Sequence, residues 1–286
     1  MSTSNAELSI EDVRLPTVRI GPARSWAPLN LRELFDFREL LFFLVWRDIK
    51  VRYKQTALGF AWALLQPLFM MAVFTLIFGR LGKLPSDGLP YSVFTLSALL
   101  PWQLFAHALN ESSNSLVASE RLISKVYFPR LFVPLAAVLG GLADFGVSLL
   151  LLIGLMAYHG IVPGIAVLTL PLFVLFAVLT AFAVGLWLSA LNVQYRDVRY
   201  TLVFLTQLWM FATPVAYAAS LVPAAWRPLY GLNPMVGVVE GFRWAILNRP
   251  TPPGGELLVS AIAVTVLLVT GLYYFRRVER TFADVI

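Results

Sequence analysis

Six long apolar runs divide most of the chain, and short segments between them hold most of its charged residues. About 20 apolar residues, rising 1.5 Å each in a helix, cross the hydrocarbon core of a bilayer. The runs cover residues 58–79, 91–110, 131–158, 165–191, 198–220 and 257–275. The pattern therefore predicts an all-α polytopic integral membrane protein, with six transmembrane helices in a domain of residues 58–286.

Ahead of the first run, residues 30–57 alternate with the period of an amphipathic helix. Apolar side chains such as Phe35, Phe42 and Trp46 share one broad face, and Arg47 and Lys50 fall on the opposite face. The pattern is broken at three positions, Arg38, Phe43 and Arg52. Such a helix is expected in the membrane interface, as a plain anchor or as a movable gate. Residues 1–29 lack the apolar region of a signal peptide and are expected to form a cytoplasmic leader.

Two segments between the runs carry helical signals of their own. In residues 111–130 a serine-rich stretch precedes apolar positions, which predicts a short helix, either a connector or a contact for a soluble partner. In residues 221–256 prolines and glycines interrupt an apolar stretch, and Asn233-Pro234 is typical of a helix start. A helix over residues 234–247 would be about 21 Å long, too short to span a bilayer. We therefore predict two short re-entrant helices there, forming a gate or a fixed lid.

Composition and charge agree with a membrane protein and set its orientation. Hydrophobic residues make up 59% of the 286 residues and charged residues 13%, against about 25% charged in soluble domains. The chain has no cysteine, which excludes a disulfide scaffold. Of 22 Lys and Arg residues, 17 lie on the side that holds both termini. This asymmetry predicts cytoplasmic termini and favours membrane orientation over nucleic-acid binding as the reason for the basic balance.

No catalytic constellation is apparent in the sequence. The only Gly-Lys pair is followed by Leu84 rather than Ser or Thr, so a phosphate-binding loop is absent. With two histidines far apart and no cysteine, no metal site is expected. We predict a transport protein without a cofactor, driven by another subunit or by an ion gradient. The mid-span Asp144 is either a polar contact between helices, which we favour, or part of a proton relay.

Aromatic and amide residues gather on one arc of the first run and one arc of the fifth. Sugars need this mixture, since rings stack on their C–H faces and amides bond their hydroxyls. The alternative is ordinary lipid-facing aromatics and contacts between helices. The residues are Trp62, Gln66 and Phe69 on the first run, and Tyr200, Phe204, Gln207 and Phe211 on the fifth.

Four stretches resemble the permease subunits of polysaccharide-exporting ABC transporters, the type-2 exporters of O-antigen, capsule and teichoic acid. They read WRDIKVRYKQTALG at 46–59 with W62 and LQP at 65–67, NSLV at 114–117 with KVYFPR at 125–130, NVQYRDV at 192–198, and NP at 233–234 with EGFR at 240–243. The resemblance covers about residues 30–280 and does not specify the sugar. A type-2 exporter permease for a small lipophilic compound remains an alternative, as does a membrane-embedded lipid-sugar transferase.

The resemblance implies partners and a location. It implies a homodimer in the bacterial inner membrane, surrounding a conduit for a lipid-linked polysaccharide. It also implies two copies of a cytoplasmic ATPase subunit, which would bind the ATP and Mg that this chain does not.

The resemblance further implies roles for particular residues. The first and fifth spans would border the conduit through the seven residues named above. Residues 115–124 would couple to the ATPase through Ser115, Leu116, Glu120, Arg121 and Lys125. The interfacial helix would be a gate that includes Phe35, Phe42, Trp46, Arg47 and Lys50. The external segment would be a periplasmic gate that includes Asn233, Pro234, Glu240 and Arg243.

Overall fold

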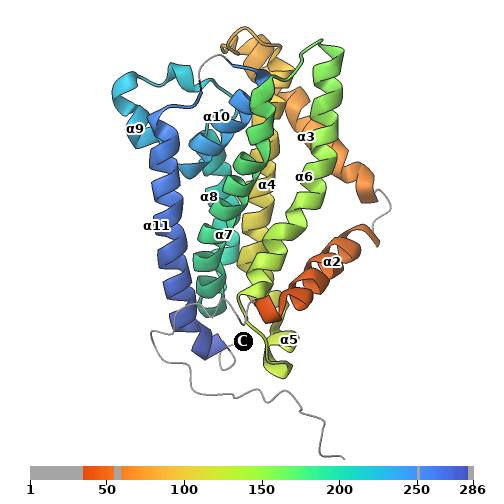
Figure 1. The fold of residues 1–286 in the computed structure, drawn as a ribbon, viewed down its shortest axis with the longest axis vertical. Coiled ribbons are helices and arrows are strands. Elements are labelled where there is room, and N and C mark those ends of the chain that lie inside the picture. Colours follow the sequence, from red (N-terminus) through yellow and green to blue (C-terminus); the bar gives the residue numbers. More distant parts are fainter. Residues whose placement is uncertain (1–34, 55–58, 250–251, 283–286) are drawn as a thin grey trace, which may run out of the picture.

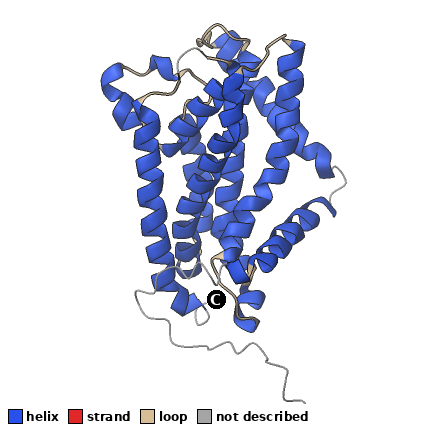
Figure 2. Ribbon diagram, viewed as in Figure 1, coloured by secondary structure: helices blue, strands red, loops and turns tan. Residues whose placement is uncertain are grey.

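The computed structural model describes residues 35–54, 59–249 and 252–282 of the chain. Within these ranges all regular structure is helical, as predicted (Figure 2). The expected leader, residues 1–29, lies outside them. The principal helices are α2 (Arg38–Lys54), α3 (Gly59–Phe74), α4 (Tyr91–Ala118), α5 (Glu120–Lys125), α6 (Phe132–Tyr158), α7 (Leu170–Gln194), α8 (Val198–Phe211), α9 (Arg227–Tyr230), α10 (Pro234–Leu247) and α11 (Gly255–Val278).

Five helical stretches among the described residues are long and apolar enough to cross a membrane, where the sequence predicts six. They are Ala61–Leu81, Tyr91–Ala118, Phe132–Tyr158, Ile165–Gln194 and Gly255–Val278. The predicted fifth span, 198–220, is helical only as far as Phe211, so α8 has 14 residues. A helix of that length covers about 21 Å, less than the hydrocarbon core. A sixth crossing would need the turns after α8 as well, and it stays a prediction.

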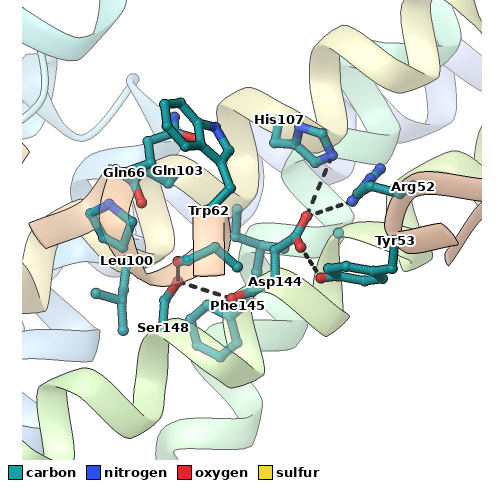
Figure 3. A pocket seen from close by; sticks show the side chains of 14 residues that line it. Arg52, Tyr53, Trp62, Gln66, Leu100, Gln103, His107, Asp144, Phe145 and Ser148 are labelled. Carbon is teal, nitrogen blue, oxygen red and sulfur yellow. Dashed lines mark hydrogen bonds and ion pairs between the residues drawn. The ribbon is translucent and has the colours of Figure 1, made fainter. Parts of the chain in front are cut away.

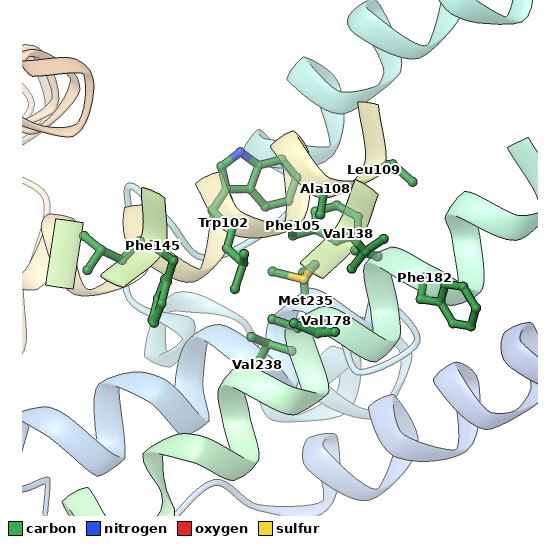
Figure 4. Close-up of a cluster of buried hydrophobic side chains, with 14 of the residues drawn as sticks. Trp102, Phe105, Ala108, Leu109, Val138, Phe145, Val178, Phe182, Met235 and Val238 are labelled. Carbon is green, nitrogen blue, oxygen red and sulfur yellow. The ribbon is translucent and has the colours of Figure 1, made fainter. Parts of the chain in front are cut away.

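Helix α4 forms the centre of the bundle. In its apolar stretch 78% of residues are buried, against 11% in Ala61–Leu81 and 17% in α11. It packs mainly against α7 and α6, and to a smaller extent against α10 and α3 (Figure 1). The core drawn in Figure 4 comes from these four helices, with Trp102 and Phe105 from α4, Val138 from α6, Val178 from α7 and Met235 from α10. Helices α3, α8 and α11 flank this core and leave much of their surface exposed.

The interfacial helix α2 lies obliquely against the lower part of α6 (Figure 1). Its most buried side chain is Leu44, which packs on Phe132 and Ala136 of α6. Leu44 was not part of the broad face predicted from the sequence, and Phe42 and Trp46 of that face are exposed. The predicted single apolar face was therefore incomplete, because it omitted the side of α2 that packs on α6. The apolar residues of α2 divide between a face on α6 and an exposed face, because the helix is covered on one side only.

The segment between α8 and α11 leaves one end of the bundle and returns to it. Ser220 Oγ bonds Asp87 Oδ1 at 3.3 Å, and Arg249 forms an ion pair with the same carboxylate. Between these two contacts the chain forms α9 and α10, and α10 has the bounds predicted from the sequence. We call the end of the bundle that carries Asp87 and α9 the α9 end, and the opposite end the α5 end (Figure 1). The re-entrant position of these helices in a membrane stays a prediction.

Candidate functional site

A cavity of about 720 Å³ lies where α2, α3, α4 and α6 meet (Figure 3). Helices α4 and α6 each contribute residues spaced by three and four positions, which places them on one face of each helix. The lining residues are Arg52 and Tyr53 from α2, Trp62, Ala63, Gln66 and Pro67 from α3, Leu100, Gln103, Leu104 and His107 from α4, and Gly141, Asp144, Phe145 and Ser148 from α6. We call this space the α2–α6 cavity.

Asp144 is the centre of polar contacts in the α2–α6 cavity. Arg52 Nη1 donates to its Oδ2 at 2.5 Å, and the Tyr53 hydroxyl donates to its Oδ1 (Figure 3). His107 Nε2 lies 3.9 Å from Oδ2, beyond hydrogen-bond distance. The pKa of Tyr53 is raised to about 12, mainly by burial and secondly by its hydrogen bond to Asp144, so the phenol keeps its proton. The predicted interhelical contact of Asp144 is confirmed: it ties α6 to α2.

Two other polar groups in the α2–α6 cavity make no hydrogen bond with the described residues. Gln103 Nε2 and His107 Nε2 are buried without a hydrogen bond to any described residue, since Asp144 Oδ2 lies too far from His107 Nε2 for one. Ser148 Oγ, in contrast, reaches the carbonyl oxygens of Ala63 and Asp144 at 3.0 and 2.9 Å. Buried donors without an acceptor are uncommon in proteins and call for an explanation.

The predicted conduit residues fall into two groups that the single chain does not bring together. Trp62 and Gln66 line the α2–α6 cavity, whereas Phe69 is not among its lining residues and is 59% exposed. The group on α8 also points outward, and Tyr200, Phe204 and Phe211 are 78%, 60% and 57% exposed. Gln207 is exposed on the same helix. Their role in a conduit stays a prediction.

The predicted ATPase-coupling residues divide between two helices, and two of them need correction. Ser115 and Leu116 belong to the last turns of α4 and are buried, since the helix continues eight residues beyond the predicted end at 110. Leu116 therefore offers no surface to a partner, and Ser115 Oγ bonds Ser112 O within α4 at 2.7 Å. The short exposed helix is α5. Glu120, Arg121 and Lys125 on α5 are exposed, as a contact with another subunit requires.

A second cavity, of about 560 Å³, separates α5 from α2. Its lining includes Arg47 and Asp48 of α2 together with Glu120 and Arg121 of α5. The predicted gate helix and the predicted coupling helix thus border one space at the α5 end.

Three of the remaining residues predicted for the gate helix, Phe42, Trp46 and Lys50, lie on the exposed side of α2. Phe42 and Trp46 stack with ring planes 7° apart, and Lys50 Nζ lies 5.3 Å from the centre of the Trp46 ring. Phe35 precedes the helix, with the Arg38 guanidinium 4.4 Å from its ring. An exposed apolar face flanked by basic groups is typical of a helix that lies in a membrane interface.

The predicted periplasmic-gate residues hold α10 in place. The Asn233 side chain accepts from Met235 N at 3.1 Å, which confirms the predicted cap, and Pro234 occupies the first helical position. Asn233 also accepts from Trp209 Nε1 of α8 at 2.8 Å. Glu240 pairs with Arg243 and with Arg249 at 3.1 and 3.0 Å. Arg243 is fully buried, with its guanidinium 3.7 Å from the centre of the Phe94 ring of α4.

Sequence reasoning missed the cluster of residues around Asp144. The signals were the interruption of the amphipathic pattern of residues 30–57 at Arg52 and the acidic Asp144 within an apolar run, and neither identified the other as its partner. Gln103 and His107 gave no signal beyond being polar within an apolar run. Their positions in the cavity follow from the packing of four helices.

The sequence is similar to a known transporter family and to several named transport permeases. Residues 39–247 match the family model described as ABC-2 type transporter. The chain is 33% identical over 254 residues to the O-antigen export system permease protein RfbA of Myxococcus xanthus, covering 87% of this chain and 96% of that protein. It is 24% identical over 234 residues to the polysialic acid transport protein KpsM of Escherichia coli, covering 82% and 91%. It is 25% identical over 226 residues to the inner membrane transport permease YadH of E. coli K12, covering 73% and 84%.

The family model spans well over half of the chain, and the first of these relatives is matched over nearly its whole length. The chain therefore belongs to the ABC-2 type transporter family, as a multi-pass membrane permease that works with an ATPase subunit.

Proposed function

We propose that this chain is the permease subunit of an ABC exporter that moves a lipid-linked polysaccharide of the O-antigen type across the bacterial inner membrane. The observation that carries the proposal is the similarity to an O-antigen export permease over 96% of that relative's length. The similarity to KpsM, named for polysialic acid transport, supports the same substrate class.

The proposed assembly is a homodimer with two cytoplasmic ATPase subunits that bind ATP and Mg. Both termini and the α5 end face the cytoplasm, in keeping with the distribution of Lys and Arg residues. In this assembly the exposed aromatic faces of α3 and α8 border the conduit. Rings at an open surface favour a long polymer, because each sugar stacks weakly and is released easily.

Removing the rings should slow export without preventing assembly. We expect the variant with Trp62, Phe69, Tyr200 and Phe204 all replaced by Ala to display at least about fivefold less surface polysaccharide, since stacking contacts contribute about 0.5–1.5 kcal/mol each. All four side chains are more than half exposed, so the substitutions leave the core intact. The measurement is surface polysaccharide in a deletion strain complemented with each variant.

The matched control replaces Leu172 and Leu258 by Ala, two exposed apolar residues on α7 and α11. It should display the wild-type amount of polysaccharide. Normal display by the ring variant, at equal permease abundance, would remove the conduit assignment and favour a small lipophilic substrate.

Force from the ATPase is proposed to enter through α5. We expect the double variant Glu120→Lys, Arg121→Glu to retain about tenfold less ATPase on purification, because opposed charges at a rim weaken association. Arg227→Glu, which reverses an exposed charge at the α9 end, serves as control and should retain the full amount. Undiminished co-purification of the α5 variant would argue against this contact.

A further inference from the structure

The charged groups of the α2–α6 cavity already satisfy one another. The Asp144 carboxylate accepts from both Arg52 and Tyr53, at opposite oxygens. A charged ligand would have to break this pair, because the cavity has no other acid or base except His107. The arrangement therefore suits an uncharged ligand.

Two side chains that line the cavity have hydrogen-bonding atoms that an uncharged ligand could use. Gln103 and His107 are one turn apart on the same face of α4, and the Nε2 atom of each is buried without a hydrogen bond to a described residue. A buried polar group without a partner costs about 1–3 kcal/mol, which a ligand with hydroxyl or ether oxygens would recover. Gln66 adds an exposed amide from the facing helix α3.

The other walls of the cavity are flat or apolar. The Trp62 indole lies beside Gln66 and Gln103, and Leu100 and Phe145 add apolar side chains to the lining (Figure 3). A sugar ring matches this lining, because its C–H face stacks on an aromatic ring while its hydroxyls bond amides. The volume, about 720 Å³, is within the range of small-molecule sites.

We propose that the α2–α6 cavity is a binding site for a neutral sugar unit, in which Trp62 stacks on the ring and Gln66, Gln103 and His107 bond its hydroxyls. The inference rests on the proposed export function and adds a site within one subunit, apart from the aromatic face of α8. A sugar held there would lie beside α2, the predicted gate helix, before entering the conduit.

The test measures sugar binding directly. The permease is reconstituted in nanodiscs free of glycolipid, and the probe is the water-soluble oligosaccharide released by mild acid from the host's own surface polysaccharide. Saturation-transfer NMR gives the dissociation constant. We expect saturable binding, weakened about five- to tenfold by Gln103→Leu and by Trp62→Ala, the loss expected for one hydrogen bond or one stacked ring.

Matched controls remove the same side chains elsewhere. Gln194→Leu at the end of α7 and Trp226→Ala near α9 delete an exposed amide and an exposed indole outside the cavity, and should bind as the wild type does. If Gln103→Leu fails to assemble, Trp62→Ala decides the test, because Trp62 is 56% exposed and contributes little to folding.

Three results would overturn the proposal. The first is absence of saturable binding, and the second is equal affinity in the cavity variants and the controls. The third is displacement of the oligosaccharide by a dodecyl ether that carries no sugar, because such displacement would show that the cavity binds a lipid tail. Any of these results is compatible with the export function, provided that the deletion strain displays less surface polysaccharide than the complemented strain. Unchanged surface polysaccharide in the deletion strain would instead refute the export function.

Discussion

Arg243→Met is expected to destabilise the permease by about 1.5–3 kcal/mol, the usual contribution of hydrogen bonds made by a charged group. Arg243 is fully buried, and its guanidinium joins three elements. It donates to Glu240 at 3.1 Å within α10, to the Val215 carbonyl at 3.0 Å after α8, and stacks on Phe94 of α4. Methionine fills much of the volume but leaves the Val215 carbonyl without this donor, and it leaves Arg249 as the remaining partner of Glu240.

Arg243→Lys should rescue little of this loss. A lysine ammonium is a compact charge that lacks the planar, five-donor geometry needed to stack on Phe94 while bonding several oxygens. The measurement is thermal unfolding of the purified permease. Arg227→Met serves as control, because Arg227 is exposed at the α9 end, and it should change stability by less than about 0.5 kcal/mol. Equal stability of the Met variants at 243 and 227 would show that Arg243 does not hold α10 in place.

Asp144→Asn is expected to loosen α2 from α6. The carboxylate is the only described group that ties the end of α2 to α6 by an ion pair, and both partners are less than a third exposed. A hydrogen bond to a charged group contributes about 1.5–3 kcal/mol. Loss of about 1.4 kcal/mol would raise the open population of α2 about tenfold.

The absence of cysteine allows this opening to be measured with one added thiol. Leu44→Cys places the thiol at a position 5% exposed against α6, and its modification rate should rise about tenfold when Asp144→Asn is added. Phe43→Cys, at a position 63% exposed, is the matched control and should react at the same rate in both backgrounds. An unchanged rate at position 44 would mean that Leu44 packing alone holds α2.

Adding Arg52→Met completes a double-mutant cycle. If Arg52 and Asp144 act through each other, the double variant should open little more than either single variant. Transport by Asp144→Asn across a range of pH separates this structural role from a proton relay, which the substitution would abolish.

Local patterns predicted those elements that depend on neighbouring residues. The apolar runs predicted the long helices, since burial of apolar side chains in lipid follows from composition over about 20 residues. Asn233-Pro234 predicted the start of α10, because a cap and a fixed φ act within one turn. A costly acid in an apolar run likewise predicted that Asp144 has a partner, although not which one.

Contacts between residues far apart in the sequence were not predicted correctly. The face of α2 that packs on α6, and the burial of Ser115 and Leu116 in α4, depend on which helix covers which side. Periodicity gives the faces of a helix but not its neighbours. The extent of α8 was also misjudged, since apolar residues continue to 220 while the helix ends at Phe211.

The sequence by itself determined an all-helical membrane permease, its family and the start of its external helix, because these follow from composition and from interactions within a few residues. Only the tertiary structure decided that Arg52 and Tyr53 meet Asp144 about 90 positions away, and that Gln103 and His107 face the same cavity. The physical reason is that these contacts form when side chains from four helices interlock, and no local preference records that packing.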